Sequence, residues 1–213
     1  MHQINRHIMF GIKILGIVFM MSGCIAVRNS PSPRFYVLKS VMTESEHKEV
    51  KISKNQLIGI GSAKIPENMD RPQIVTQDQA GLLKFAQFDR WGEPLTIGVA
   101  RLIREDLSQM IPKVTFVGSP WNREVDLKYK VEIEIIQLDS VLDKDLDLVA
   151  QWMIIDGQSL KTMAIKKTEF HQPITPHDHT GLARALSMAC GAISHDIADG
   201  LATLTPSKER KDE

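Results

Sequence analysis

The sequence is poor in the features that mark a nucleic-acid-binding protein, a disulfide-rich fold or a membrane-spanning helix. Its 26 basic residues equal its 26 acidic residues, which gives no electrostatic reason to propose nucleic acid as a partner. It has only two cysteines, Cys24 and Cys190. The early apolar run Ile14–Met21 would be about 12 Å long as a helix, too short to cross a bilayer. The remaining chain is therefore expected to depend on a packed core for its stability.

Motifs for catalysis, cofactors and metals are also missing. There is no Gly-x-Ser-x-Gly or His-Glu-x-x-His motif, and "GIGSAK" at 59–64 lacks the residues of a dinucleotide or phosphate loop, so its glycines are interpreted as strand glycines. His171 and the "HDH" run at 177–179 have no cysteine or glutamate at ligand spacing. Asp178 and Thr180 suit helix capping better than metal binding. We predict no cofactor, no metal and no enzymatic activity.

The N-terminal segment has the order of a secretory signal. Arg6 and Lys13 precede the apolar run, and Ser22-Gly23-Cys24 follows it and resembles a bacterial lipobox, with Met21 in place of the usual leucine. We predict that residues 1–23 are a signal peptide and that Cys24 is the acylated mature N-terminus, palmitate being one such acyl group. Cys190 would then lack a disulfide partner within the chain. The alternative is a plain signal peptide or an N-terminal anchor with an incidental cysteine.

The remaining chain is predicted to form one domain between two polar segments. Residues 24–33, rich in Ser, Pro and Asn, are expected to be a tether, 34–205 the domain, and 206–213 a disordered tail. Strands are expected at 34–40, 56–66, 72–77, 82–91 and 114–120. The stretch 125–138 alternates apolar and charged residues, and with 146–156 and 160–170 it predicts an antiparallel meander.

Two amphipathic helices are expected, at 93–112 and 181–204. The first has an apolar stripe, with Arg101, Arg104, Glu105 and Asp106 away from much of it. The second turns Cys190 inward as a small buried residue, beside Leu186, Ile193 and Ile197. The predicted fold is an α/β single-domain sandwich: a mixed sheet covered by two long helices, with a meander and a helix in the C-terminal half.

Two connections allow either a structural or a binding interpretation. In 65–75, prolines flank Asp70 and Arg71, and in 88–95, Arg90 and Trp91 precede the first helix. In the structural interpretation, Arg71 bonds nearby carbonyls or Asp70, and Trp91 fills the core. In the binding interpretation, these residues form part of a surface for a partner.

The motifs "MDRPQIV" and "RWGEPL", together with the lipobox and "FYVL", resemble the ABC-type transport auxiliary lipoproteins, the paraquat-inducible protein C family. Met69 and Gly92 depart from the leucine and alanine usual there. The resemblance implies a Rossmann-like fold and an outer-membrane lipoprotein facing the periplasm. It also implies a mammalian-cell-entry (MCE) domain tunnel protein as partner, phospholipid or another hydrophobic molecule as cargo, and homo-oligomers. Ile25, where aspartate would retain the protein in the inner membrane, agrees with the outer membrane.

Arg71, Arg90 and Trp91 are the candidate residues for contacting the tunnel protein or a neighbouring protomer. Because Trp91 stands just before a helix, we expect it to belong to the core and the two arginines to be the better interface residues. Two other functions remain open: a structural or assembly-type envelope lipoprotein, and a lipid-tethered periplasmic hydrolase.

Overall fold

The computed structural model describes residues 31–42, 48, 50, 52–53, 55–122 and 125–204. The chain divides into two compact units, Met1–Ser32 and Pro33–Glu213, and all the elements below belong to the second. The predicted signal peptide, Cys24, most of the tether and the predicted tail at 206–213 lie outside the described residues. Within the described residues, no helix is long and apolar enough to span a membrane.

Both predicted helices are present. Helix α2 runs from Leu95 to Met110 and buries the whole predicted stripe: Leu95, Val99, Leu102, Ile103, Leu107 and Met110. Helix α3 runs from His179 to Thr203, and Asp178 caps it by accepting a 2.9 Å hydrogen bond from the Gly181 N–H. Cys190 is completely buried in α3, as its helical face predicted.

The strands form two sheets. The small sheet has the order β1-β4-β3, with β1 at Arg34–Tyr36, β4 at Leu83–Trp91 and β3 at Gln73–Gln77. The large sheet has the order β5-β2-β6-β7-β8. Its strands are β2 at Leu57–Ile60, β5 at Thr115–Gly118, β6 at Leu127–Ser140, β7 at Asp145–Asp156 and β8 at Thr162–Pro173.

The α/β class and the antiparallel meander β6-β7-β8 are confirmed. The prediction of one sheet is refined, because β2 already pairs in parallel with β5 on one side and with β6 on the other. Neither side of β2 is left for β1, β3 or β4. Those strands pair among themselves, with β1 parallel and β3 antiparallel to β4.

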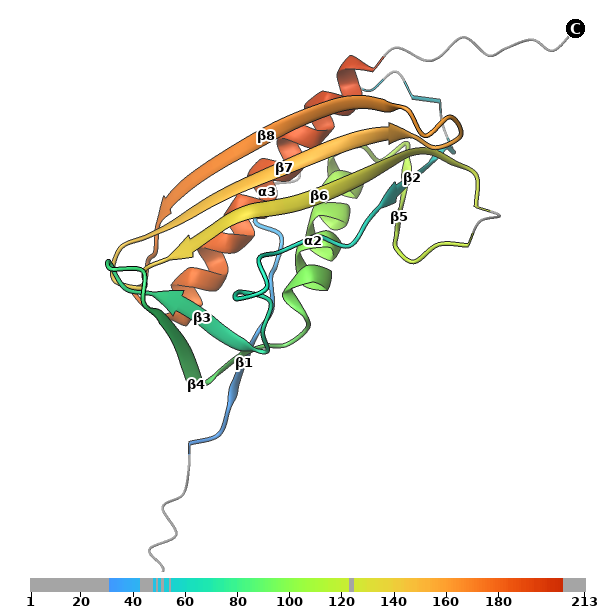
Figure 1. The fold of residues 1–213 in the computed structure, drawn as a ribbon. Helices are drawn as coiled ribbons and strands as arrows, with labels where there is room; N and C mark the ends of the chain where they lie inside the picture. The colour runs from blue at the N-terminus through green and yellow to red at the C-terminus, as the bar shows by residue number, and fades with distance from the viewer. Residues whose placement is uncertain are drawn as a thin grey trace, which may run out of the picture. The chain divides into compact units, whose positions relative to one another are not determined.

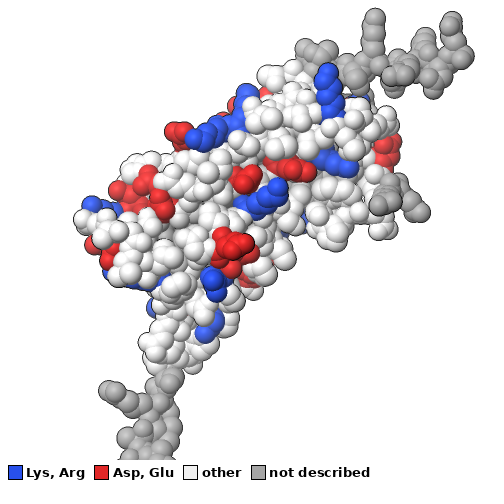
Figure 2. Space-filling model, in the orientation of Figure 1, with Lys and Arg blue, Asp and Glu red and all other residues white. Residues whose placement is uncertain are grey.

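Helices α2 and α3 lie on one face of the large sheet, and no helix of the described residues covers the opposite face (Figure 1). On β6 the residues facing the helices are buried in the core: Tyr129, Val131, Ile133 and Ile135. Basic and acidic side chains are interspersed over the open face (Figure 2). The clean alternation in the sequence thus corresponds to one buried and one exposed side.

Trp152 on β7 fixes the position of α3 over the sheet. Its side chain is fully buried, and its Nε1 donates a 3.1 Å hydrogen bond to Thr168 of β8. Thr168 in turn donates a 2.6 Å bond to Asp196 of α3. A Cβ at Gly200 would lie 2.7 Å from the indole ring, so glycine is needed for this close approach.

Asp106 is the exception to the predicted polar face of α2. Its side chain is 1 % exposed, whereas the sequence placed it away from the apolar stripe. Ser40 donates a 2.6 Å hydrogen bond to one carboxylate oxygen, and Ser194 of α3 donates a 3.3 Å bond to the other. Burial raises the pKa of Asp106. The prediction that Asp106 lies on the polar face of the helix was wrong. The hydroxyl groups that bind its carboxylate in the interior come from segments distant in the sequence.

Candidate partner-binding surface

Two motifs that are separate in the sequence meet at the small sheet. The Trp91 N–H donates a 2.8 Å hydrogen bond to the carbonyl oxygen of Pro72, and Arg90 pairs with Gln73 in the β3–β4 ladder. The connection at 66–72 therefore lies against the end of β4. This contact brings the backbone next to Arg71 close to that of Arg90.

The loop that carries Arg71 is held from beneath by Met69, whose side chain is 7 % exposed and belongs to the core. The Pro66 carbonyl oxygen accepts hydrogen bonds of 2.8 and 3.1 Å from the N–H groups of Met69 and Asp70. With one buried residue and a closed turn, the loop presents Arg71 to solvent from a fixed backbone.

Arg71 is exposed and Arg90 is half-buried. Within the part of the chain that the structure describes, neither guanidinium forms an ion pair or a side-chain hydrogen bond. The bonds predicted from Arg71 to carbonyls or to Asp70 are not among the contacts of the described residues. An arginine fork without intramolecular partners is available to bind a carboxylate or carbonyl groups of another molecule.

Trp91 lies in the core, 8 % exposed, as expected from its place before α2. It alternates along β4 with Arg90, so the two side chains project from opposite faces of the strand. The indole therefore packs beneath the small sheet, and Arg90 projects from the opposite face of the sheet.

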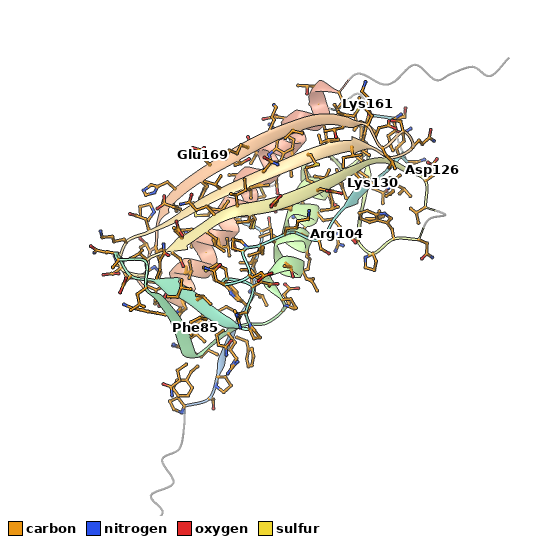
Figure 3. The ribbon with its side chains drawn as sticks, viewed as in Figure 1. Phe85, Arg104, Asp126, Lys130, Lys161 and Glu169 are labelled. Atoms are coloured by element: carbon orange, nitrogen blue, oxygen red, sulfur yellow. The ribbon has the colours of Figure 1, made fainter. Side chains whose placement is uncertain are left out.

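Large apolar side chains accompany the arginines. Phe35 of β1 pairs in parallel with Arg90, so the two lie on the same face of the small sheet, and Phe35 is 64 % exposed. Phe85 of β4, labelled in Figure 3, is 54 % exposed, and Leu82 in the turn before it is 66 % exposed. We call Phe35, Arg71, Phe85 and Arg90 the small-sheet surface.

A buried carboxylate fixes the short strand β1. The Asp89 side chain is 7 % exposed, and its oxygens lie 2.7 and 2.9 Å from the Arg34 guanidinium. Tyr36 donates a 2.8 Å hydrogen bond to it, and His179 Nδ1 at the start of α3 lies 3.2 Å away. Asp89 thus joins β1, β4 and α3.

The electrostatics of this cluster follow from that geometry. The Arg34 guanidinium, through its hydrogen bond, is the largest cause that holds the pKa of Asp89 below its usual value. Burial, with the neighbouring Asp89, raises the pKa of the Tyr36 phenol. Asp89 and Arg34 are therefore both charged at neutral pH, and their contact holds β1, with the exposed Phe35, in place. Sequence reasoning missed Asp89 and its partners because no local pattern links them.

Two of the histidines that could have suggested a metal site have other contacts. His179 faces Asp89, and His171 Nδ1 lies 2.7 Å from Asp147 on the neighbouring strand β7. That contact raises the pKa of His171. Among residues 31–42, 48, 50, 52–53, 55–122 and 125–204, no three His, Cys, Asp or Glu side chains are grouped so that they could hold a metal ion.

A hollow of about 270 Å³ lies on the open face of the large sheet. Apolar Trp121 and Met153 line it together with Lys64, Lys130 and Glu132. Gly59 makes room for the indole of Trp121, since a Cβ there would lie 3.1 Å from the ring. The lining mixes both charges with apolar surface.

Comparison with known proteins agrees with the fold. A crystal structure of an uncharacterized protein matches with a TM-score of 0.64 at 14 % identity, covering 79 % of this chain and 98 % of that one. A crystal structure of a Xanthomonas campestris protein matches with a TM-score of 0.60 at 14 % identity, covering 77 % and 92 %. At these identities the likeness concerns the fold alone. No curated protein matches the sequence.

The family comparison reaches further than the structural one. The model of the ABC-type transport auxiliary lipoprotein component matches residues 36–198, from β1 to the last turns of α3. The match includes Arg71, Arg90 and Trp91, and it confirms the resemblance found in the sequence motifs. The chain belongs to the ABC-type transport auxiliary lipoprotein family.

Proposed function

We propose that this protein is the outer-membrane docking subunit of an ABC-type intermembrane transport system. In this proposal, acyl groups on Cys24 anchor it to the periplasmic face of the outer membrane. Its domain binds an MCE-domain tunnel protein that carries phospholipid or another hydrophobic cargo. Family membership supports the transport association and the lipoprotein character. The lipobox-like segment and Ile25 support the anchor and the choice of membrane.

The single observation that carries the docking role is the pair of arginines on the small-sheet surface. The Pro72–Trp91 hydrogen bond brings together the backbone segments that carry Arg71 and Arg90, and neither arginine pairs with a charged group among the described residues. Exposed Phe35 shares a face with Arg90. Arginine and aromatic residues are enriched among those that dominate protein interfaces.

The chemistry of this surface favours a partner with carboxylates beside an apolar contact. Each guanidinium can bind one carboxylate through two parallel hydrogen bonds, and Phe35 can fill an apolar pocket next to them. The role is binding without catalysis. The same surface could accept a tunnel protein or a neighbouring protomer, and the partner recovered in the test below distinguishes the two.

The test is copurification of tagged Arg71→Ala and Arg90→Ala variants with envelope proteins. If either arginine is a true hot spot, its truncation costs at least ~2 kcal/mol, or about a thirtyfold loss of affinity. Recovery of the MCE protein should then fall sharply. Arg184→Ala is the matched control, because Arg184 is an exposed arginine on α3, outside the small sheet.

Thermal melting of all three variants must be close to wild type, since each truncated side chain is at the surface or only half-buried. Wild-type recovery of the partner by both Arg71→Ala and Arg90→Ala would contradict the assigned surface. Loss of recovery by Arg184→Ala as well would show that the effect is not specific to the small sheet.

A further inference from the structure

The last strand of the large sheet has an open edge. Strand β8 pairs antiparallel with β7 along Thr162–Pro173 and ends the strand order. On its other side, no backbone hydrogen bond joins it to any described residue. Figure 3 shows β8 at the border of the sheet, with Glu169 on it. A long free edge of N–H and C=O groups is a template for pairing with a further strand.

The two faces of β8 differ. Ala164, Thr168 and Phe170 turn toward α3, and Phe170 is only half-buried there. Ile165, Lys167 and Glu169 alternate with them on the open face, where Ile165 is 57 % exposed. Lys167 Nζ lies 3.4 Å from the Glu169 carboxylate, and both side chains are more than half exposed. On the open face, one positive charge and one negative charge thus directly flank Thr168.

We propose that two copies of this chain pair through β8, antiparallel and with a twofold axis at Thr168. A twofold axis perpendicular to the sheet keeps each face on its own side. Residues opposite each other across the seam must therefore project from the same face of their strands. This condition allows the axis to pass through Lys167, Thr168 or Glu169 near the middle of the strand.

The charges distinguish these three registers. With the axis at Thr168, Lys167 of each copy lies opposite Glu169 of the other, so the seam gains two pairs of opposite charge. With the axis at Lys167 two ammonium groups meet, and at Glu169 two carboxylates meet, which is unfavourable for directly opposite residues. The Thr168 register also keeps Met163–Pro173 within the paired region, nearly the full length of β8.

The position of α3 is compatible with this seam. Thr168 is bonded to Asp196, so α3 lies over β8, and the symmetry places both copies of α3 on the same side of the joined sheet. Adjacent strands are about 4.8 Å apart and packed helices about 8–10 Å apart, so helices set back from the seam have room to meet across it. That contact would cover the half-buried Phe170 and enlarge the interface beyond the strands.

The experiment measures the mass of the full chain, purified in detergent, by light scattering over a range of concentrations. Wild type should form a dimer. Lys167→Glu and Glu169→Lys should each raise the dimer dissociation constant about tenfold, since each turns two attractive pairs into two repulsive ones. The double variant K167E/E169K should restore it to within about threefold of wild type, because both pairs are re-formed with opposite signs.

Matched controls carry the same charge changes away from the seam. Glu132→Lys changes an exposed residue of the central strand β6, and Lys161→Glu changes an exposed residue before β8. Both should dimerise as wild type does. All variants should melt as wild type does, because Lys167 and Glu169 are exposed.

A monomeric wild type at every concentration would overturn the proposal, and so would a double variant no better than the singles. A wild type that stays monomeric until a transport partner is added would assign the β8 edge to that partner instead. This inference does not depend on the proposed docking function, since it concerns another edge of the molecule and is read from self-association alone.

Discussion

Replacing Asp106 with asparagine removes a charge from the contact between α2 and α3 and keeps the shape of the side chain. Asp106 is 1 % exposed and accepts hydrogen bonds from Ser40 and Ser194. An asparagine can still accept from Ser40 through its oxygen and donate to Ser194 through its nitrogen. In the variant Ser194 can accept this bond, because its single hydroxyl proton can be donated to the Cys190 carbonyl oxygen, 2.9 Å away, instead of to residue 106.

The expected magnitude follows from two opposing effects. Dehydrating one buried ion costs several kcal/mol, and two hydroxyl hydrogen bonds to a carboxylate offset about 3 kcal/mol of that cost. We expect Asp106→Asn to raise the free energy of unfolding by about 1 kcal/mol near neutral pH. The substitution removes the dehydration cost of the buried ion, which is larger than the stabilisation by the charged hydrogen bonds that is lost with it. Asp106→Ala should instead be about 1–3 kcal/mol less stable than Asp106→Asn, because Ser40 loses its acceptor.

The pH dependence has a definite sign. Burial raises the pKa of Asp106, so the folded state favours the protonated carboxyl. The stability that this preference contributes to the protein is complete at pH values below the ordinary aspartate pKa of about 3.9. It is lost as the pH rises through the pKa that Asp106 has in the folded state. The advantage of Asp106→Asn over wild type should therefore grow from acidic to neutral pH and then become constant.

Urea unfolding of both proteins at a series of pH values measures this difference directly. A difference that does not change with pH would show that the Asp106 pKa is the same in the folded and unfolded states. An asparagine variant clearly less stable than wild type at neutral pH would show that the charged hydrogen bonds outweigh dehydration.

Three further predictions concern individual residues. Trp91→Ala should remove roughly 3–5 kcal/mol of stability in denaturant unfolding, because the side chain is buried in the core. A variant that melts as wild type does but loses its partner would instead make Trp91 an interface residue. Cys190→Ala should lower the free energy of unfolding by only about 1 kcal/mol. In the folded protein Cys190 should resist thiol reagents, because burial raises the pKa of its thiol. Loss of function with the fold retained would reveal a reactive thiol. Cys24→Ser should accumulate unprocessed precursor without radiolabelled fatty acid, and normal labelling would refute lipidation at this residue.

Much of the fold could be predicted because its elements have strong local periodicity. The alternation along β6 identified its buried residues, and the spacing of apolar residues identified the inward faces of α2 and α3. The cap at Asp178 and the burial of Trp91 were also predicted from neighbouring residues. The two motifs that identified the family are short continuous stretches of the same kind.

Periods and caps depend on residues within one or two turns of each other, so the order of the chain is enough to find them. The division into two sheets depends on which strand edges remain free once β2 is paired on both sides. The partners of Asp89 come from β1 and α3, and those of Asp106 from the segment after β1 and from α3. The approach of the backbone next to Arg71 to that of Arg90 depends on one hydrogen bond, from the Trp91 N–H to the Pro72 carbonyl oxygen. Such contacts join residues that are far apart in the sequence and form only when the fold closes the loops between them. The order of residues near each contact does not predict which distant segment will be its partner.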